Sequence, residues 1–333
     1  MQTVFRTRMI LFVSIFLCML GFAAAIVAED NIRVSLPGRR VKVATIAIGR
    51  TGNRDKNQHE TKLRLALEHL ATAGQQGVDI VCLPEEFAGT TPETIPGPTT
   101  KAVAELARKY RMYVVCPMCE QCDDGRQYNT AVLLDRAGEV VGRYREVFIW
   151  WGEGLNPSRE GVPVFDTDFG RIAILNCFDT NFDEVWQQAE RKGAEMVLWP
   201  GGYGGGMPLN GYAMIHNYYV VSAGWGNMID ILGKTVDAEK PRPQQFVATL
   251  DLDRTLIHKD FNKEKVARLL QEHASEVAEE QPLDMEGWYL LHSLKPGVRV
   301  RDLCKQFQIE TLREYRHRSR EQINDARVKD KRI

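Results

Sequence analysis

Short apolar runs alternate with amphipathic stretches along most of the chain from Val41 onward. Runs rich in Val, Ile and aromatic side chains predict buried β-strands. Leucines and alanines at helical spacing in residues 59–75 and 100–110 predict amphipathic helices between strands. This alternation predicts an α/β domain in which helices cover a sheet. The strands are predicted at residues 41–48, 78–83, 112–116, 129–134, 171–175, 196–199, 219–222 and 245–250.

The pattern changes after the last predicted strand. Apolar side chains at helical spacing predict a helix over residues 263–278, and residues 309–326 are dense in alternating charges. We therefore assign residues 41–262 to a core domain and residues 263–333 to a C-terminal helical extension. The extension is expected to pack on the core or on a partner subunit. The extension contains an arginine cluster formed by Arg316, Arg318 and Arg320. We expect this cluster to be a solvated face rather than a binding patch.

Residues 1–28 are predicted to be a signal peptide. Arg6 and Arg8 precede an uncharged apolar stretch, and the alanines at 23–25 supply the small residues that a signal peptidase accepts. Cleavage near Ala28 would leave a periplasmic or secreted protein with no stable membrane insertion. The apolar run is also close to the roughly 20 residues that span a bilayer, so an uncleaved membrane anchor is the alternative.

Composition and net charge indicate the size class of the domain and give no reason to expect a nucleic acid partner. The chain has 333 residues, 44% of them hydrophobic, which is enough to bury a large core in one domain of the α/β size class. The formal net charge is -1. Because duplex binding depends on an excess of clustered Lys and Arg, this balance gives no reason to expect a nucleic acid partner.

Two residues at predicted strand ends carry candidate chemistry. Cys177 follows the apolar run at residues 171–175 and precedes a stretch of helical composition. At such a corner, backbone N–H groups converge and the positive end of the helix stabilises a thiolate. Glu85 follows the run at residues 78–83, and catalytic groups in α/β sheets gather beyond the carboxyl ends of strands. A carboxylate beside a thiol can take its proton. Taken alone, however, a cysteine at a strand end is more often an inert core residue than a nucleophile.

Three segments together resemble the nitrilase, or carbon-nitrogen hydrolase, superfamily. They are Leu-Pro-Glu-Glu-Phe at residues 83–87, Gly-Arg-Tyr-Arg-Glu-Val-Phe at 142–148, and Gly-Arg-Ile-Ala-Ile-Leu-Asn-Cys-Phe-Asp at 170–179. The resemblance implies a four-layer αββα sandwich that commonly dimerises, so we expect a homodimer or larger homo-oligomer. It also implies a Glu-Lys-Cys triad with no metal and no organic cofactor.

By position, the resemblance implies Cys177 as the nucleophile, Glu85 as the general base and Glu153 as a second carboxylate that orders the site. Glu86 is the alternative base if the register differs by one residue. The implied reaction is hydrolysis of a non-peptide amide or an N-carbamoyl amine through a thioester. The alternative is a catalytically silent protein of the same fold that binds a small ligand or a protein partner.

The sequence departs from the family pattern at three positions. Glu146 stands where the resemblance calls for the triad lysine, Asn176 stands where an apolar residue is usual, and Phe178 replaces a common tyrosine. Along an extended strand, Arg145 would point away from the face of Glu146 and cannot supply the missing cation. An ionised Glu146 would oppose the Cys177 thiolate, whereas a protonated one could donate a hydrogen bond to an oxyanion.

Two further patterns have open interpretations. The spacing of Cys116, Cys119 and Cys122 could ligate a metal, but no fourth ligand follows at a familiar spacing. A Cys119–Cys122 disulfide is expected ahead of a metal site in an exported protein, and Cys116 and Cys82 are expected to be buried strand residues. Finally, a glycine-rich segment and several aromatic residues are expected to line the pocket or to pack in the core. They are residues 201–206, Trp150, Trp151, Tyr203 and Trp225.

Overall fold

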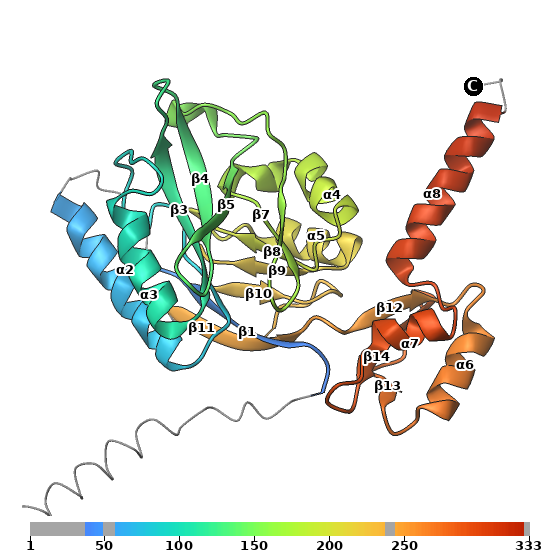
Figure 1. Cartoon of the computed structure of the whole chain (residues 1–333). Helices are drawn as coiled ribbons and strands as arrows, with labels where there is room; N and C mark the ends of the chain where they lie inside the picture. Colours follow the sequence, from blue (N-terminus) through green and yellow to red (C-terminus); the bar gives the residue numbers. More distant parts are fainter. Residues whose placement is uncertain (1–36, 49–56, 237–243, 330–333) are drawn as a thin grey trace, which may run out of the picture. The chain divides into compact units, whose positions relative to one another are not determined.

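The computed structural model describes residues 37–48, 57–236 and 244–329. The predicted signal peptide lies outside these residues. Within the described part, no helix combines the length and the apolar character needed to cross a membrane. Figure 1 shows two sheets stacked in the core, with helices on the outer side of each, followed by a C-terminal extension.

The first sheet has six strands in the order β11-β1-β2-β3-β4-β5. Its centre is parallel, because β1 pairs with β2 and β2 with β3 in that sense, and the remaining pairs are antiparallel. Helices α2 (Asn57–Gln75) and α3 (Pro98–Tyr110) cover one face. The strands are β1 (Arg40–Ile46), β2 (Ile80–Cys82), β3 (Tyr113–Gln121), β4 (Gln127–Leu134), β5 (Val140–Arg145) and β11 (Gln245–Asp251).

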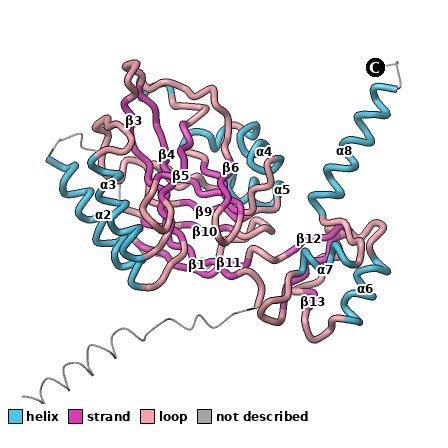
Figure 2. The backbone as a smooth tube through the Cα atoms, in the orientation of Figure 1, coloured by secondary structure: helices cyan, strands magenta, loops and turns pink. Residues whose placement is uncertain are grey.

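The second sheet has five strands in the order β10-β9-β8-β7-β6. Helices α4 (Asp183–Arg191) and α5 (Met207–His216) lie on its outer side, as the tube drawing in Figure 2 also shows. Neither α5 nor the short strands β6 and β10 was predicted from the sequence. The strands are β6 (Val164–Asp166), β7 (Arg171–Ile174), β8 (Met196–Trp199), β9 (Tyr219–Ser222) and β10 (Asn227–Ile229).

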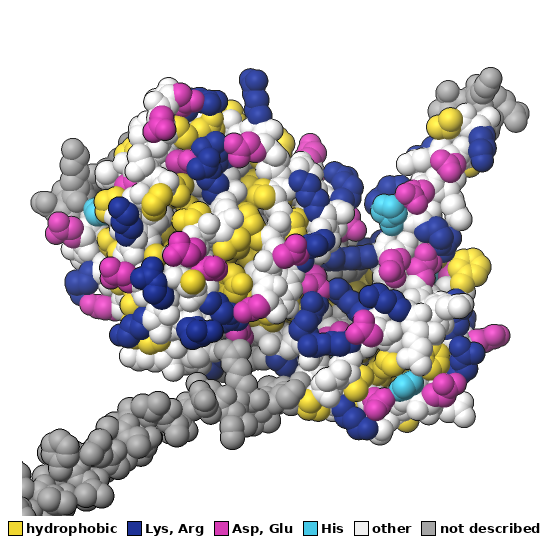
Figure 3. Space-filling view, in the orientation of Figure 1, with side chains coloured by type: hydrophobic (Ala, Val, Ile, Leu, Met, Phe, Trp, Pro, Cys, Tyr) yellow, Lys and Arg dark blue, Asp and Glu magenta, His cyan; other side chains and the backbone are white. Residues whose placement is uncertain are grey.

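Alternating side chains of β1 show how the layers are built. Val41 and Val43 belong to the core between the two sheets, whereas Ala44 and Ile46 belong to the core under α2 and α3. Successive side chains of a strand point to opposite faces, so a central strand must be apolar on both. The predicted four-layer αββα sandwich is thereby confirmed. On the face shown in Figure 3, acidic and basic side chains are interspersed among hydrophobic ones.

The C-terminal extension contains more than helices. A three-stranded sheet in the order β12-β14-β13 accompanies three helices. The helix predicted for residues 263–278 ends at Glu272, and Val277 lies instead in β13, where it pairs with Ser293. The elements are β12 (Thr255–His258), α6 (Lys263–Glu272), β13 (Val277–Glu279), β14 (Trp288–Ser293), α7 (Val300–Gln306) and α8 (Leu312–Lys329).

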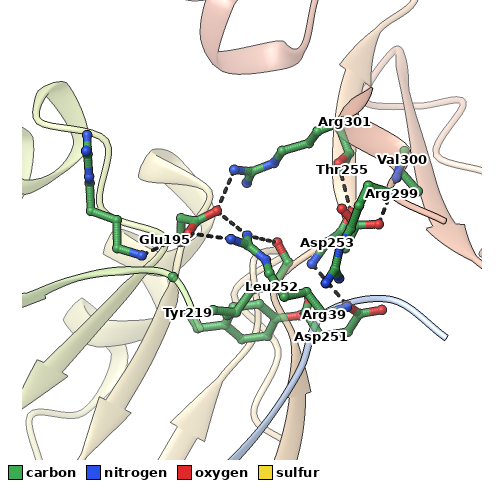
Figure 4. A network of polar contacts seen from close by, with 12 residues as sticks. Arg39, Glu195, Tyr219, Asp251, Leu252, Asp253, Thr255, Arg299, Val300 and Arg301 are labelled. Atoms are coloured by element: carbon green, nitrogen blue, oxygen red, sulfur yellow. Dashed lines mark hydrogen bonds and ion pairs between the residues drawn. The ribbon is translucent and has the colours of Figure 1, made fainter. Parts of the chain in front are cut away.

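Polar contacts connect residues of the extension to residues of the core. The Glu195 carboxylate accepts hydrogen bonds from the guanidinium groups of Arg39 and Arg301 (Figure 4). Arg316 donates to Ile215 O at 2.6 Å, at the carboxyl end of α5. The expectation of a purely solvated arginine cluster is therefore wrong for Arg316, because a guanidinium satisfies the free carbonyls at a helix end.

Candidate active site

Two loops that follow strands of different sheets form the candidate site. Glu85 lies beyond the carboxyl end of β2, and Cys177 lies beyond the carboxyl end of β7. Their side chains are 9% and 8% exposed, respectively. The Glu85 carboxylate lies close enough to the cysteine thiol to raise the pKa of the thiol. The fold thus brings together two residues that are far apart in the sequence and places a thiol in contact with a base.

The backbone turns sharply at Cys177. Its φ of 26° lies outside the usual range for a non-glycine residue. The Cys177 N–H donates to Pro200 O at 3.0 Å, and the nearby backbone of Gly202 acts to lower the pKa of the thiol. Burial raises the pKa of the thiol well above its usual range, and the carboxylates of Glu85 and Glu146 raise it further. The geometry suits a nucleophile, but the electrostatics oppose a resting thiolate.

Asn129, in β4, connects two carboxyl groups of the site. Its Nδ2 donates to Glu85 Oε1 and to Glu146 Oε2, each at 2.6 Å. Its Oδ1 accepts from Asn176 Nδ2 at 3.4 Å. Within the described residues, Oδ1 of the fully buried Asn176 has no hydrogen-bond partner. No role was predicted for Asn129 from the sequence, although a lone amide within an apolar strand is a signal that could have identified it.

Glu146 follows β5 and is 1% exposed. Its Oε1 accepts a hydrogen bond from the Phe178 N–H at 2.9 Å. Burial raises the pKa of this carboxyl well above its usual range, and the nearby charges of Asp179, Glu85 and Glu153 act in the same direction. This shift favours the protonated carboxyl that the sequence analysis considered.

The neighbouring cation points elsewhere, as predicted. Arg145 Nε donates to Glu120 Oε2 at 2.8 Å, and Arg145 Nη1 donates to Glu160 Oε1 at 2.8 Å. Both contacts lie on the opposite side of β5 from Glu146, because adjacent side chains of a strand alternate between faces. Arg145 therefore cannot stabilise an anion at Cys177.

Glu153 completes a group of three carboxyls. It ends the short helix η1 (Trp151–Glu153). One oxygen from each of Glu85, Glu146 and Glu153 lies within 4.8 Å of the others, a grouping that could hold a cation. Oxygen-only ligands of this kind suit hard cations such as Ca²⁺ or Mg²⁺. The structure thus brings together all four residues that the sequence analysis singled out: these three and Cys177.

Asp179 braces the loop that carries Cys177. Its carboxylate accepts hydrogen bonds from Tyr144 Oη at 2.6 Å, from the Phe148 N–H at 3.1 Å and from the Asn176 N–H at 3.0 Å. Burial raises the pKa of Asp179 to about 7, while these hydrogen bonds act to lower it. These hydrogen bonds connect the end of β5 to the turn at Cys177, so they set the distance between Glu146 and the nucleophile.

One of the aromatic residues considered in the sequence lies near the site. Burial raises the pKa of the Tyr203 phenol, and the charges of Cys177, Glu85 and Glu146 also act to raise it, so Tyr203 lies near the site. The Trp225 ring packs against the glycine-rich segment at Gly204, where an added Cβ would lie 3.2 Å from the ring. Two more exposed rings, with centroids 6.1 Å apart, precede or begin η1: Trp150 and Trp151.

Four further cysteines were considered in the sequence, and they fall into a buried group and a partly exposed group. Cys82 and Cys116 are fully buried strand residues, as predicted. Cys119 and Cys122 are free thiols, so the expected disulfide between them is not formed in this structure. Burial raises the pKa of Cys119 to about 11, with Glu153 as the first of several acidic neighbours that raise it further. Within the described residues, neither thiol belongs to a group of side chains that could hold a metal ion.

A family model matches the part of the chain that holds the candidate site. Residues 42–219 match the family model for carbon-nitrogen hydrolases. The chain belongs to this family. The matched range includes Glu85, Glu146, Glu153 and Cys177, so the whole candidate site lies within the carbon-nitrogen hydrolase domain.

Curated relatives and solved structures are similar to parts of the chain. Formamidases of Bacillus cereus (strain Q1) and Bacillus anthracis are each 33% identical over 148 residues, which is 40% of this chain and 45% of each relative. The chain thus matches less than half of their length. The structure of Saccharomyces cerevisiae Nit3, a nitrilase superfamily member, aligns with a TM-score of 0.57 at 20% identity, covering 64% of this chain and 90% of Nit3. An amidase from Nesterenkonia sp. aligns with a TM-score of 0.57 at 21% identity, covering 72% and 98%. These two likenesses establish the fold alone.

Proposed function

We propose that the protein is an exported hydrolase of a small non-peptide amide or N-carbamoyl amine, acting through a thioester on Cys177. The placement of the Glu85 carboxylate beside the Cys177 thiol, close enough to raise the pKa of the thiol, is the observation that carries the proposal. The name formamidase, borne by relatives that match part of the chain, supports an amide as substrate.

The reaction would proceed in two steps. In the first, Cys177 Sγ attacks the carbonyl carbon while Glu85 takes the thiol proton and passes it to the departing amine. In the second, Glu85 takes a proton from water, the resulting hydroxide attacks the thioester, and the proton returns to the Cys177 sulfur. The acid leaves and the free thiol is restored. Glu153 and Asn129 would hold Glu85 in place, and no cofactor enters either step.

A second candidate function is favoured by Glu146. Its carboxyl contributes to raising the pKa of the Cys177 thiol and lies where the resemblance implies a stabilising cation. A protein with this site could bind a small amide or a protein partner without turning it over. The two functions share one pocket and differ only in whether the thiol ever becomes a nucleophile.

Ammonia release separates the two functions. The full chain would be incubated with a panel of aliphatic amides and N-carbamoyl amines, with Cys177→Ala as the matched control. Hydrolysis of one class that disappears in Cys177→Ala supports the hydrolase. Ligand binding by calorimetry without ammonia release in any member of the panel would leave the silent binding protein as the function.

We further propose that the protein acts outside the cytoplasm and as a homodimer or larger homo-oligomer. The signal-like residues 1–28 support export. The resemblance and the C-terminal extension support assembly.

A further inference from the structure

The Phe178 N–H belongs to the residue that directly follows the nucleophile, whose own N–H is engaged by Pro200 O. In hydrolases whose nucleophile stands at a sharp strand-to-helix turn, the N–H of the next residue points at the oxygen of the attacked carbonyl and stabilises its negative charge. Cys177 stands at such a turn, with a φ of 26°, and the helical turn η2 (Cys177–Asn181) begins there. The Phe178 N–H is therefore the expected oxyanion donor of this site.

That donor already has a partner within the protein. Glu146 Oε1 accepts the Phe178 N–H at 2.9 Å, the distance at which an oxyanion donor would engage a substrate oxygen. The second oxygen of the same carboxyl accepts from Asn129 Nδ2 at 2.6 Å. A carboxyl oxygen resembles the oxygen of a tetrahedral intermediate in size and in its ability to accept hydrogen bonds.

The backbone around Glu146 holds the carboxyl in this position. The Glu146 N–H donates to Asn129 O at 2.9 Å, and Glu146 O accepts from the Ser158 N–H at 2.9 Å. Both backbone groups of the residue are thus engaged by different segments. The side chain can leave the Phe178 N–H only by rotating about its own bonds, and its 1% exposure leaves little room for that rotation.

We propose that the Glu146 carboxyl is a built-in occupant of the oxyanion position, held there by the Phe178 N–H and Asn129. The inference deepens the proposed function, because it takes Cys177 as the residue that meets a carbonyl carbon. A ligand carbonyl can then reach the Phe178 N–H only in competition with Glu146. Occupancy, and not only negative charge, blocks the site.

An aldehyde tests the proposal directly. Addition of the Cys177 thiol to an aldehyde forms a C–S bond and turns the carbonyl oxygen into an alkoxide or hydroxyl, with Glu85 relaying the thiol proton. The adduct depends on the oxyanion donor but needs no leaving group. Propanal labelled with ¹³C at the carbonyl carbon reports the adduct by NMR in the full chain. Cys177→Ala identifies the signal as the adduct at this thiol.

Three variants separate occupancy from charge. Glu146→Ala removes both and is expected to bind propanal roughly tenfold to a hundredfold more tightly than the wild type. Glu146→Gln removes the charge but retains an oxygen of similar reach, so it is expected to remain blocked. Glu139→Ala, at an exposed glutamate in the turn before β5, is the matched control and should behave as the wild type.

The outcomes are distinct. A Glu146→Gln variant that gains as much affinity as Glu146→Ala would assign the block to charge and overturn the proposal. So would an adduct in the wild type as strong as in Glu146→Ala. If Glu146→Ala forms no adduct, the proposal also fails, and iodoacetamide labelling of Cys177 in that variant shows whether the proposed function fails with it. A labelled thiol leaves the hydrolase possible, whereas an inert thiol removes it.

Discussion

The phenol of Tyr144 donates a 2.6 Å hydrogen bond to Asp179 Oδ2, across 35 residues of sequence. Both side chains are fully buried. Tyr144→Phe would leave the Asp179 carboxylate without one of its donors in a site that water does not reach. We expect the free energy of unfolding to fall by about 1–3 kcal/mol, measured by urea denaturation.

A matched control distinguishes the lost hydrogen bond from the lost oxygen atom. Tyr110→Phe removes the same atom from a partly exposed tyrosine at the end of α3 and should change stability by less than about 0.5 kcal/mol. Equal losses in the two variants would show that the contact with Asp179 contributes nothing specific.

Stability should depend on pH through Glu195. Burial alone would raise the pKa of its carboxyl, but hydrogen bonding by Arg39, the charge of Arg301 and the Arg171 N–H outweigh burial and lower the pKa. Because the folded pKa lies below the unfolded value of about 4.3, the stabilisation is complete above that value. It is lost as the pH falls through the folded pKa.

Glu195→Gln tests this linkage. The variant should be less stable than the wild type at pH 6, and the difference should shrink as the pH falls below about 4. Urea denaturation at a series of pH values measures both curves. A stability difference that stays constant from pH 6 to pH 3 would mean that the carboxylate charge is not what stabilises the network of Figure 4.

Self-association should depend on the C-terminal extension. We expect the full chain to sediment as a homodimer or larger assembly at micromolar concentration, as the family resemblance implies. The end of α8 (Leu312–Lys329) that follows its contacts with the core can be removed by truncation. A weaker assembly in the truncated protein would show that the helix contributes to the interface. A monomer at micromolar concentration of the full chain contradicts the expectation.

Export predicts a shortened N-terminus. If the signal peptide is removed, N-terminal sequencing of protein from the native host should begin between Ile26 and Asp30. Residue Met1 at the N-terminus of the native protein would instead point to the uncleaved anchor or to a cytoplasmic protein.

The four layers of the core were implied by the family resemblance. Apolar patterning predicted the strand that carries Asn129 and the strands that precede Glu85 and Cys177, but not β5, which precedes Glu146. It missed α5 because Gly206 and Pro208 interrupt the sequence pattern, and it missed β6 and β10 because three residues are too few to show a period. It extended the helix after residue 263 too far because Val277 continues the helical spacing, although its pairing with Ser293 places it in a strand.

The residues of the site were likewise predicted only in part. Family motifs in the sequence identified Glu85, Glu146, Glu153 and Cys177, which the fold brings together. Asn129 could not be assigned in this way, because its role depends on a contact between strand β4 and two loops distant in sequence. The contact between Glu146 and the Phe178 N–H likewise depends on the turn at Cys177, which residue spacing does not specify.

Glu146→Lys should increase amide hydrolysis if the rest of the site is intact. An ammonium at this position would replace a group that opposes the Cys177 thiolate with one that stabilises it, and would also free the Phe178 N–H. One oxyanion donor is typically worth about a hundredfold to a thousandfold in rate, so we expect weak or absent wild-type turnover at pH 7 and a gain of at least that order in the variant. Ammonia release with the responsive amide measures both proteins. Brisk wild-type turnover that neither Glu146→Lys nor Glu146→Gln changes would show that another residue completes the site and that Glu146 does not stand in the place of the lysine.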